Sequence, residues 1–508
     1  MFIGRQEELN TLNALYQEKG GQLVVLYGRR RIGKTELLRQ FCKGKPHIFY
    51  SAREIADAEQ LAAFSGALLA SGMEAAQYLH TFSDWHTAFS AISSIPTQQK
   101  RLIVLDEFPY MAQTNRSILS TLQQLWDSQF KDQDVMLILC GSSMSFIEEQ
   151  LLGSTTPLFG RTSAIIKLLP LSFSDASRFF ERYSLRDTIA SYAILGGIPH
   201  YLKQFDDGQP LRANIEERIL QRFSPLYNEA EFMLKQSLRE VATYNSIIQA
   251  VALGRTKLNV IHDATQLEKS KLSAYLHNLI ELGVVYREVP ITEERTQRGL
   301  YRLKDEFFRF YYAFVFPYLS ELEQGGGPII WETVIQPQLS SFIAPTFENI
   351  CIEYLRSLHR SGALPVALAK IGRWWDAHHE IDILGFDAQR THYIVGECKY
   401  QAAAMNTHDI QHTVASFSPK EKEARLHHWF FSLSGFTPQA VEMAKTHGYT
   451  LVDSKAINAW LHGRLPAIVV GGGIGEAVPQ EVDAVVAGDG EAEVGALPDP
   501  QLRYGRIV

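Results

Sequence analysis

One octapeptide near the start of the chain constrains the fold more than any other feature. It reads Gly28-Arg29-Arg30-Arg31-Ile32-Gly33-Lys34-Thr35. A short apolar run, residues 22–27, precedes it, and residues 36–41 after it have helical spacing. A strand, a glycine-bounded turn and a helix N-terminus in that order form a cradle for phosphate groups. The sequence therefore predicts a nucleotide site at the end of a buried strand.

The residue types of this turn match the parts of an ATP site. The backbone from Gly28 to Gly33 would wrap the phosphates, and Lys34 would reach the β- and γ-phosphates. The Thr35 hydroxyl would ligate Mg²⁺. The alternative is a chance match in a loop, which the flanking strand and helix disfavour.

A second buried strand, residues 101–106, ends in two carboxylates. Asp106 would hold Mg²⁺ through its water shell, and Glu107 would orient and polarise the attacking water. A further strand, residues 135–140, ends in Gly141-Ser142-Ser143, where Ser142 or Ser143 would sense the γ-phosphate. The second acid favours a hydrolysing ATPase over a nucleotide kinase.

Two arginines outside the turn are further candidates. Arg161 precedes a fifth predicted strand, residues 164–168, and is a candidate arginine finger, supplied in cis or by a neighbouring subunit of a homo-oligomer. Its alternative is an ordinary surface arginine. Arg5 lies in a Gly-Arg turn before an acidic amphipathic helix, where we expect either a contact with the nucleotide or a simple helix cap.

Five strands separated by helices predict an α/β fold with a parallel, doubly wound sheet. Right-handed crossovers would place all these residues at its carboxyl edge. From residue 172 the pattern becomes helical and includes Gly196-Gly197-Ile198-Pro199, which predicts a small lid behind the nucleotide. The predicted divisions are a P-loop core at 1–171, a helical lid at 172–230, a winged helix with a connecting helix at 231–324, an α/β domain at 325–465 and an acidic, poorly ordered tail at 466–508.

Residues 231–304 have the pattern of a winged helix, with three helices followed by two strands. The basic residues that would meet DNA phosphates are Lys269, Lys271, Arg295 and Arg298. The alternative is a module used only for packing or protein contact, because acidic residues are interleaved with the basic ones. The net charge of −7 gives no overall basic footprint for nucleic acid. The aromatic-rich helix at residues 307–318 is expected to form an interdomain core.

A second group of chemical residues lies in the domain after residue 325. Alternation along the strand at residues 392–400 puts Glu397 and Lys399 on one face, and Asp382 lies between apolar neighbours in the preceding strand. Glu348 would face them from a helix at about 344–359. The three carboxylates could hold Mg²⁺ or Mn²⁺, with Lys399 positioning the water that attacks a phosphodiester. The alternative is a solvated hairpin with an incidental Glu-x-Lys.

Two resemblances follow from these motifs. Residues 2–203 resemble the archaeal-type family of P-loop ATPases, related to the STAND and AAA classes and found in archaea and bacteria. The matching residues are Phe2-Ile3-Gly4-Arg5, the P-loop, Leu105-Asp106-Glu107-Phe108, Gly141-Ser142-Ser143, Gly160-Arg161 and Gly196-Gly197-Ile198-Pro199. Residues 330–465 resemble the C-terminal domain of unknown function that accompanies this ATPase, which is similar to PD-(D/E)XK nucleases. Glu348, Asp382, Glu397 and Lys399 fall on that motif, with Ile381 in place of its proline.

Composition limits the remaining options. No stretch offers the ~20 uninterrupted apolar residues of a membrane span, and we expect a cytoplasmic protein with reduced, unpaired cysteines. Two hypotheses remain open. In the first, ATP turnover drives a metal-dependent nuclease domain that acts on DNA. In the second, the chain is a regulatory NTPase switch whose C-terminal fold binds without cutting.

Overall fold

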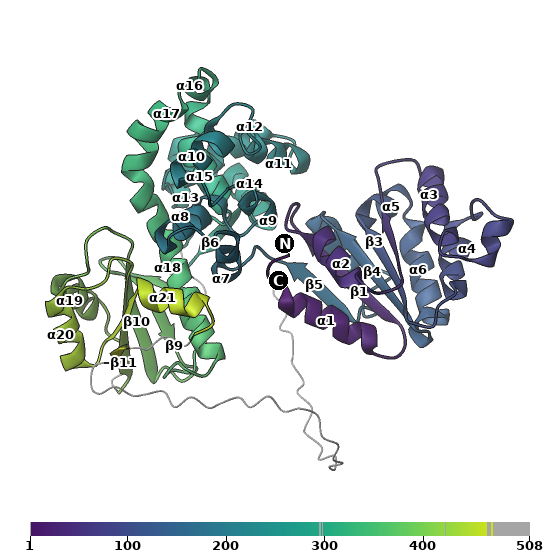
Figure 1. Ribbon diagram of the computed structural model, residues 1–508. Coiled ribbons are helices and arrows are strands. Elements are labelled where there is room, and N and C mark those ends of the chain that lie inside the picture. The colour runs from purple at the N-terminus through teal and green to yellow at the C-terminus, as the bar shows by residue number, and fades with distance from the viewer. Residues whose placement is uncertain (1, 294–295, 297, 422, 465–468, 471–508) are drawn as a thin grey trace, which may run out of the picture.

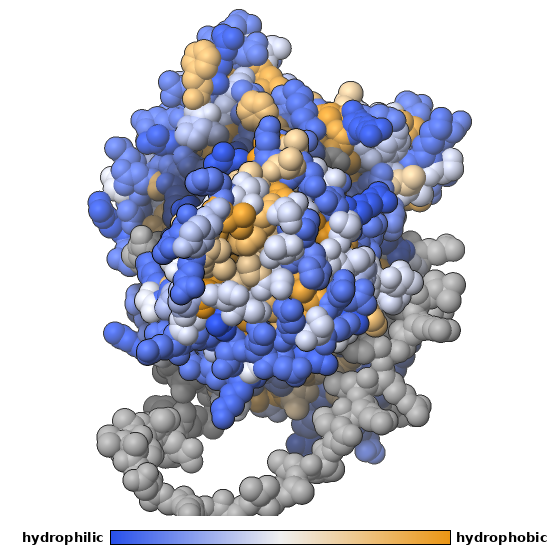
Figure 2. Space-filling model, turned by 90° about the vertical axis from the view of Figure 1, so that its right-hand side faces the viewer, coloured by the Kyte–Doolittle hydropathy of each residue, from blue (hydrophilic) through white to orange (hydrophobic). Residues whose placement is uncertain are grey.

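The computed structural model describes residues 2–293, 296, 298–421, 423–464 and 469–470 of the chain. Figure 1 shows an N-terminal sheet unit, a helical region beside it and a C-terminal sheet unit below that region. Figure 2 views the molecule from the side of the N-terminal unit, where hydrophilic residues cover most of the face and apolar ones show near its centre. No helix in the described part is both long and apolar enough to cross a lipid bilayer.

The N-terminal sheet is parallel throughout. Its strands are β1 Gln22–Gly28, β2 His47–Ser51, β3 Arg101–Asp106, β4 Val135–Gly141 and β5 Ala164–Leu168. They lie in the order β2-β3-β4-β1-β5. The predicted strands are confirmed, and β4 separates the strand before the P-loop from the strand with the two carboxylates. The chain therefore has the expected α/β sheet with its loops gathered at one edge.

Alternation along β1 explains the layers on either side of this sheet. Val24 and Leu26 belong to the core under α1 and α2, whereas Leu23 and Val25 belong to the core under the helices of the other face. Strands buried on both faces read as continuous apolar runs, as this one does. The flanking helices are α1 Gln6–Gln17, α2 Lys34–Cys42, α3 Asp57–Leu69, α4 Trp85–Ser90, α5 Phe108–Thr114 and α6 Ser117–Ser128.

The helical region after the sheet links the two ends of the molecule. Its elements are α7 Phe173–Ala176, α8 Leu185–Leu195, α9 Pro199–Leu202, α10 Leu211–Ile215 and α11 Glu229–Ser237. One side of α8, with Ile189 and Ala190, belongs to the core of the C-terminal unit, and the other side, with Ile194 and Leu195, belongs to the core that continues under the N-terminal sheet. The expected lid is thus also a support for the C-terminal unit.

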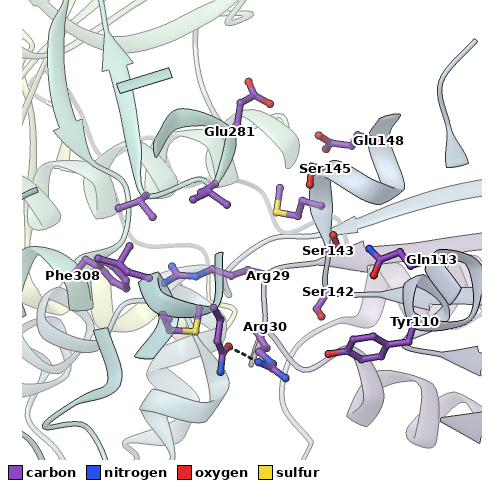
Figure 3. Close-up of a pocket in the computed structure, with 16 residues that line it drawn as sticks. Arg29, Arg30, Tyr110, Gln113, Ser142, Ser143, Ser145, Glu148, Glu281 and Phe308 are labelled. Atoms are coloured by element: carbon purple, nitrogen blue, oxygen red, sulfur yellow. Dashed lines mark hydrogen bonds between the residues drawn. The ribbon is translucent and has the colours of Figure 1, made fainter. Parts of the chain in front are cut away.

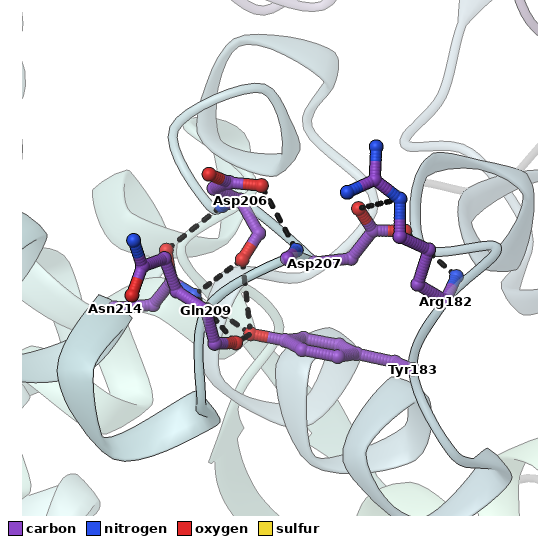
Figure 4. A network of polar contacts seen from close by, with 7 residues as sticks. Arg182, Tyr183, Asp206, Asp207, Gln209 and Asn214 are labelled. Carbon is purple, nitrogen blue, oxygen red and sulfur yellow. Dashed lines mark hydrogen bonds and ion pairs between the residues drawn. The ribbon is translucent and has the colours of Figure 1, made fainter.

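Polar contacts fix the loop between α9 and α10, as Figure 4 shows. The Asn214 side-chain amide donates to the Tyr183 hydroxyl and to the Asp206 carbonyl, at 2.7 Å each. The Asp207 carboxylate accepts from the Arg182 backbone N–H at 2.8 Å. The loop is therefore pinned on both sides.

Three helices and a two-stranded antiparallel hairpin follow in the predicted succession. They are α12 Val241–Ala252, α13 Leu258–Thr265, α14 Lys269–Glu281, β6 Val285–Glu288 and β7 Leu300–Leu303. Arg295 lies outside the described residues, and Arg298 pairs with Glu293 at 3.2 Å. The hairpin is not free-standing, because the Ile291 N–H donates to the Arg373 carbonyl of the C-terminal unit at 3.0 Å.

The aromatic helix α15, Glu306–Phe314, is buried as expected. Its rings Phe307, Phe308, Phe310, Tyr311, Tyr312 and Phe314 are all in the core. Two short helices, α16 Leu319–Glu323 and α17 Gly327–Ile330, lead from it to the C-terminal unit. The predicted interdomain core is confirmed.

The C-terminal unit consists of a long helix and a mixed sheet. The helix α18 spans Gln336–Arg360 and begins about two turns before the predicted start near residue 344. The earlier start was hidden by two prolines: Pro337 lies in the first turn, where its missing N–H costs nothing, and Pro345 lies inside the helix. The strands are β8 Lys370–Trp375, β9 Glu380–Phe386, β10 His392–Lys399, β11 Arg425–Ser432, β12 Thr450–Asp453 and β13 Val469–Val470, in the order β13-β12-β11-β10-β9-β8.

Three further helices complete this unit: α19 Thr407–Ser416, α20 Pro438–His447 and α21 Ser454–Leu461. The β10–β11 and β11–β12 pairs are parallel, and the other pairs are antiparallel. In the predicted tail, Val469 and Val470 pair with β12, and residues 471–508 lie outside the described part of the chain. The four cysteines are buried and unpaired, as expected.

Candidate functional site

The turn between β1 and α2 needs its glycines. Gly33, which caps α2, has φ 96°, in the left-handed region that favours glycine. Gly28 has φ 156°, and a Cβ added there would lie 2.7 Å from the Leu168 carbonyl oxygen of β5. The free N–H groups and the positive end of α2 begin directly after Gly33, which suits this turn to an anion.

Lys34, Thr35 and Asp106 meet at the end of the parallel strands. Lys34 is buried, and its ammonium donates to the Gly28 carbonyl at 3.0 Å and to the Arg29 carbonyl at 3.3 Å. This burial lowers the pKa of Lys34. The Thr35 hydroxyl donates to Asp106 Oδ2 at 2.8 Å. A hydroxyl and a carboxylate oxygen side by side are ligands that fit Mg²⁺.

Glu107 and Ser142 also lie together. Glu107 follows β3 directly and has φ 52°, an unfavourable value for a residue other than glycine. Its Oε2 accepts from the Ser142 hydroxyl at 2.9 Å and from the Ser142 N–H at 3.3 Å. The strained backbone therefore aims the second carboxylate toward the tip of β4, which is the neighbour expected from the sequence.

A cavity of about 380 Å³ opens beside these groups. Lys34, Thr35 and Glu107 line it together with Arg5 and residues of the helical region. The latter are Phe179, Pro199, His200 and Lys203. Burial lowers the pKa of His200. Sequence reasoning missed Phe179, His200 and Lys203, although Gly-Gly-x-Pro pointed to the segment that carries two of them.

Arg5 braces the P-loop from behind. Its guanidinium donates to the Leu169 carbonyl at 2.6 Å and to the Ile32 carbonyl at 3.3 Å, and it pairs with Glu8 at 3.1 Å. Arg5 has φ 67° and is the N-cap residue of α1, but its side chain makes no capping hydrogen bond to that helix. Its polar contacts in this structure are with protein groups, so its contact with a nucleotide stays a prediction.

The three arginines of the P-loop project toward the helical region. Arg29 pairs with Asp305, Arg30 bonds to Gln236, and Arg31 pairs with Glu229. The sequence placed these three residues in the turn whose backbone would wrap the phosphates and gave their side chains no separate role. The structure instead gives each one a partner on a later segment of the chain.

Arg161 departs from the expected clustering at the carboxyl edge. It lies just before β5, at the amino end of the sheet. Two residues later, the Ser163 N–H donates to the Leu23 carbonyl of β1 at 2.7 Å, and this contact opens the pairing of β5 with β1. Its guanidinium forms two bonds to Asp127 on α6, at 2.7 and 2.8 Å. The length of β1 separates it from the P-loop, so a finger supplied in cis is excluded in this arrangement and only a finger supplied in trans stays a prediction.

The C-terminal residues come together on β9 and β10. The register that pairs Ile383 with Gly396 brings Asp382 level with Glu397. Asp382 Oδ2 accepts from the Cys398 N–H at 2.9 Å, and Lys399 Nζ donates to Glu397 Oε1 at 2.6 Å. The predicted common face of Glu397 and Lys399 is therefore present.

Glu348 reaches the same place from α18. Burial, reinforced by Glu380 and Glu397 and opposed by Arg373, raises the pKa of Glu348 to about 7. Burial together with Glu348 and Glu397 raises the pKa of Asp382 well above its usual range. Glu348, Asp382 and Glu397 therefore lie near one another in a poorly solvated place, where a cation would offset their repulsion.

Two basic groups already occupy this site. Arg373 on β8 lies 3.2 Å from Glu348 and 2.6 Å from Glu380, and Lys399 holds Glu397. One Glu348 oxygen is buried without a hydrogen bond. Across the described residues, no group of three or more His, Cys, Asp or Glu side chains is arranged to hold a metal ion. The donors suit Mg²⁺ or Mn²⁺ by type, but their arrangement does not fit one as it stands. Sequence reasoning missed Arg373.

Comparison with known proteins adds to this geometry. A family described as an ATPase domain predominantly from Archaea matches residues 2–205, and one described as archaeal and bacterial proteins of unknown function matches residues 311–412. A protein of Methanocaldococcus jannaschii, named only as uncharacterised, is 31% identical over 402 residues, which cover 79% of this chain and 88% of the relative.

Two further similarities cover less. An uncharacterised ATP-binding protein of the same organism is 47% identical over 45 residues, 9% of this chain and 76% of that one. The solved structure of a Walker-type ATPase from Pyrococcus abyssi is 19% identical with a TM-score of 0.46, over 61% of this chain and 96% of that one.

Proposed function

Because the chain belongs to the family of ATPase domains found predominantly in Archaea, we propose that it binds ATP at the P-loop and hydrolyses it with Mg²⁺. The observation that carries the proposal is the meeting of two pairs at one edge of the sheet, Thr35 with Asp106 and Glu107 with Ser142. Lys34 lies between them and the P-loop backbone.

Each side chain has a role in phosphoryl transfer. Lys34 would exchange its two carbonyl contacts for the β- and γ-phosphates, and Thr35 and Asp106 would hold Mg²⁺. When bound, Mg²⁺ neutralises charge on the phosphates. Glu107 would orient the attacking water, and Ser142 keeps that carboxylate in place.

The test is release of inorganic phosphate from ATP by the full chain, with Mg²⁺ and with excess EDTA. We expect turnover with Mg²⁺ and none with EDTA, because the Thr35 and Asp106 oxygens act on ATP through the cation. Tight ATP binding without turnover would instead favour the regulatory switch. Absence of both would reject the proposal.

We further propose that α12, α13, α14 and the β6–β7 hairpin form a winged helix that connects the ATPase to the C-terminal unit. Lys269 and Lys271 are exposed on α14 and are its candidate contacts with DNA phosphates. The loop between β6 and β7 is bonded to β8 through the Ile291 N–H and the Arg373 carbonyl. The main role that we propose for this module is therefore to connect the two units.

A second candidate function is metal-dependent cleavage of DNA at Glu348, Asp382, Glu397 and Lys399. The observation that favours it is the register of β9 and β10, which brings Asp382 level with Glu397 and near Lys399, with Glu348 facing them from α18. Burial and the neighbouring acids raise the pKa of Glu348 and of Asp382. Since Arg373 and Lys399 supply positive charge here, both pairs would have to rearrange before a cation could bind.

Lys399→Ala is expected to abolish any Mg²⁺- or Mn²⁺-dependent cleavage of plasmid DNA and to leave ATP turnover within about twofold, since the residue lies in a different sheet. Lys445→Ala, an exposed lysine on α20, is the matched control and should retain cleavage. Supercoiled and linear plasmid, with and without ATP, are the substrates. If the unmutated chain cuts neither while hydrolysing ATP, the C-terminal unit is a binding module.

A further inference from the structure

The P-loop is attached to the rest of the molecule by its own arginines. Figure 3 shows Arg29 and Arg30 lining a cavity between the sheet unit and the helical region, with Arg29 beside Phe308. On the sheet side, the cavity is bounded by the turn after β1 and by the segment after β4. This cavity measures about 400 Å³ and is lined by Ser142 and Ser143 on one side and by Glu281 on the other. From this cavity Arg29 pairs with Asp305, 276 positions away, and Arg30 bonds to Gln236, 206 positions away. Arg31 lines the cavity beside Lys34 and pairs with Glu229.

The acidic partners are buried more deeply than the arginines, so we expect the arginine side chains to be the ones that move. The side chains of Asp305 and Glu229 are only 4% and 2% exposed, against 16% and 33% for Arg29 and Arg31. Asp305 caps α15 by accepting from the Phe308 N–H at 2.8 Å, and Glu229 accepts from the Tyr201 hydroxyl at 3.0 Å. A carboxylate buried in this way is costly without a counter-charge.

Arg29 has unused hydrogen-bonding capacity that an anion could fill. One terminal nitrogen of Arg29 is buried without a hydrogen-bond partner, although its guanidinium lies 5.0 Å from the centre of the Phe308 ring. Arg31, with φ 68°, is held in the left-handed region, so its side chain leaves the turn in a direction set by the turn itself. Both side chains start from the loop that would wrap the phosphates.

We propose that Arg29 and Arg31 form an ion-pair latch in which Asp305 and Glu229 compete with the phosphates of a bound nucleotide for the same two guanidinium groups. This latch rests on the proposed ATP site. Phosphate oxygens entering the turn draw the arginines toward them and weaken their hold on the helical region. Loss of nucleotide restores the two pairs.

A short series of contacts connects Asp305 to the helix that carries Glu348. Asp305 precedes Glu306, whose carboxylate bonds to Arg309 at 2.6 Å and accepts from the Thr346 hydroxyl at 3.1 Å. Thr346 lies two residues before Glu348 on α18. A change at the N-terminus of α15 is thus one contact away from the helix that carries Glu348. Asp305 and Glu229 act as positioning residues.

Asp305→Asn removes the negative charge that pairs with Arg29 but keeps a side chain that can cap α15. Asparagine caps a helix about as well as aspartate, so α15 should keep its first turn. With Arg29 released, we expect ADP and a non-hydrolysable ATP analogue to bind at least fivefold more tightly in a fluorescence titration. Glu281→Gln removes a charge from the wall of the same cavity without touching the latch, and should change affinity by less than twofold.

A double-mutant cycle distinguishes the latch from general electrostatics. In an Arg29→Gln background, Asp305→Asn should no longer tighten nucleotide binding. An equal gain in both backgrounds, or no gain in either, overturns the latch.

A readout without nucleotide separates this inference from the ATPase proposal. Amide hydrogen exchange at residues 29–35 should become faster in Asp305→Asn and stay unchanged in Glu281→Gln. Exchange at the start of α15 should stay unchanged in both variants, because asparagine keeps the cap. If the unmutated chain binds no nucleotide, the ATPase proposal fails and the competition fails with it, while faster exchange would still establish the ion-pair attachment. Unchanged exchange rejects the attachment itself.

Discussion

Glu107→Gln is expected to lower ATP turnover by about 10²- to 10³-fold and to leave nucleotide affinity within about threefold. Glutamine has the shape of glutamate, and its amide oxygen can accept from the Ser142 hydroxyl and N–H as Glu107 does now. Its neutral amide cannot polarise the attacking water or accept a proton from it as a carboxylate does. Turnover is measured by phosphate release, and affinity by titration with a fluorescent nucleotide.

Glu149→Gln is the matched control for this variant. Glu149 is exposed and lies in the segment after β4, so the same chemical change there should leave turnover unaltered. Full turnover in Glu107→Gln would remove Glu107 from the catalytic role. Loss of binding together with turnover would show instead that its carboxylate supports the fold of the pocket.

Gly197→Ala is expected to destabilise the protein by about 3 kcal/mol or more. A Cβ at this position would lie 2.0 Å from the Leu171 carbonyl oxygen and 2.7 Å from the Leu171 nitrogen. Both contacts are with backbone atoms, and the Leu171 N–H donates to the Gly197 carbonyl at 2.8 Å. No side-chain rotation can relieve that overlap. The midpoint of urea unfolding is the measurement.

Gly66→Ala makes the same chemical change with the opposite expected sign. Gly66 lies inside α3, and a Cβ there would have no heavy atom within 4 Å. Replacing a glycine within a helix should stabilise it by about 0.5–1 kcal/mol. If both variants shift the midpoint alike, the close approach of residues 171 and 197 does not decide stability.

The convergence of the candidate nucleotide site could be predicted because its parts obey local rules. Parallel strands end at one edge of a sheet, so Lys34, Asp106 and Ser142 had to converge once their strands were recognised. The apolar runs that mark those strands are visible in any short window. Arg161 was misplaced at this edge because it precedes its strand instead of following it.

The partners of the P-loop arginines could not be predicted in the same way. Asp305 and Glu229 lie in helices with their own local reasons for an acid, as a cap and as a first-turn residue. Nothing in a short window shows that these helices pack against residues 29–31. Arg373 was missed for a related reason, since its match to Glu348 depends on how β8 sits beside α18.

The long helix α18 has a mechanical consequence. Its first half is tied to α15, because Arg309 donates to the Phe342 carbonyl and to the Thr346 hydroxyl at 2.7 Å each. Its second half, including Ile350 and Leu355, is built into the core beneath β9 and β11. A single helix of 25 residues, about 37 Å long, therefore connects the helical region rigidly to the C-terminal sheet. We therefore expect the helical region and the C-terminal sheet to move as one body relative to the N-terminal sheet.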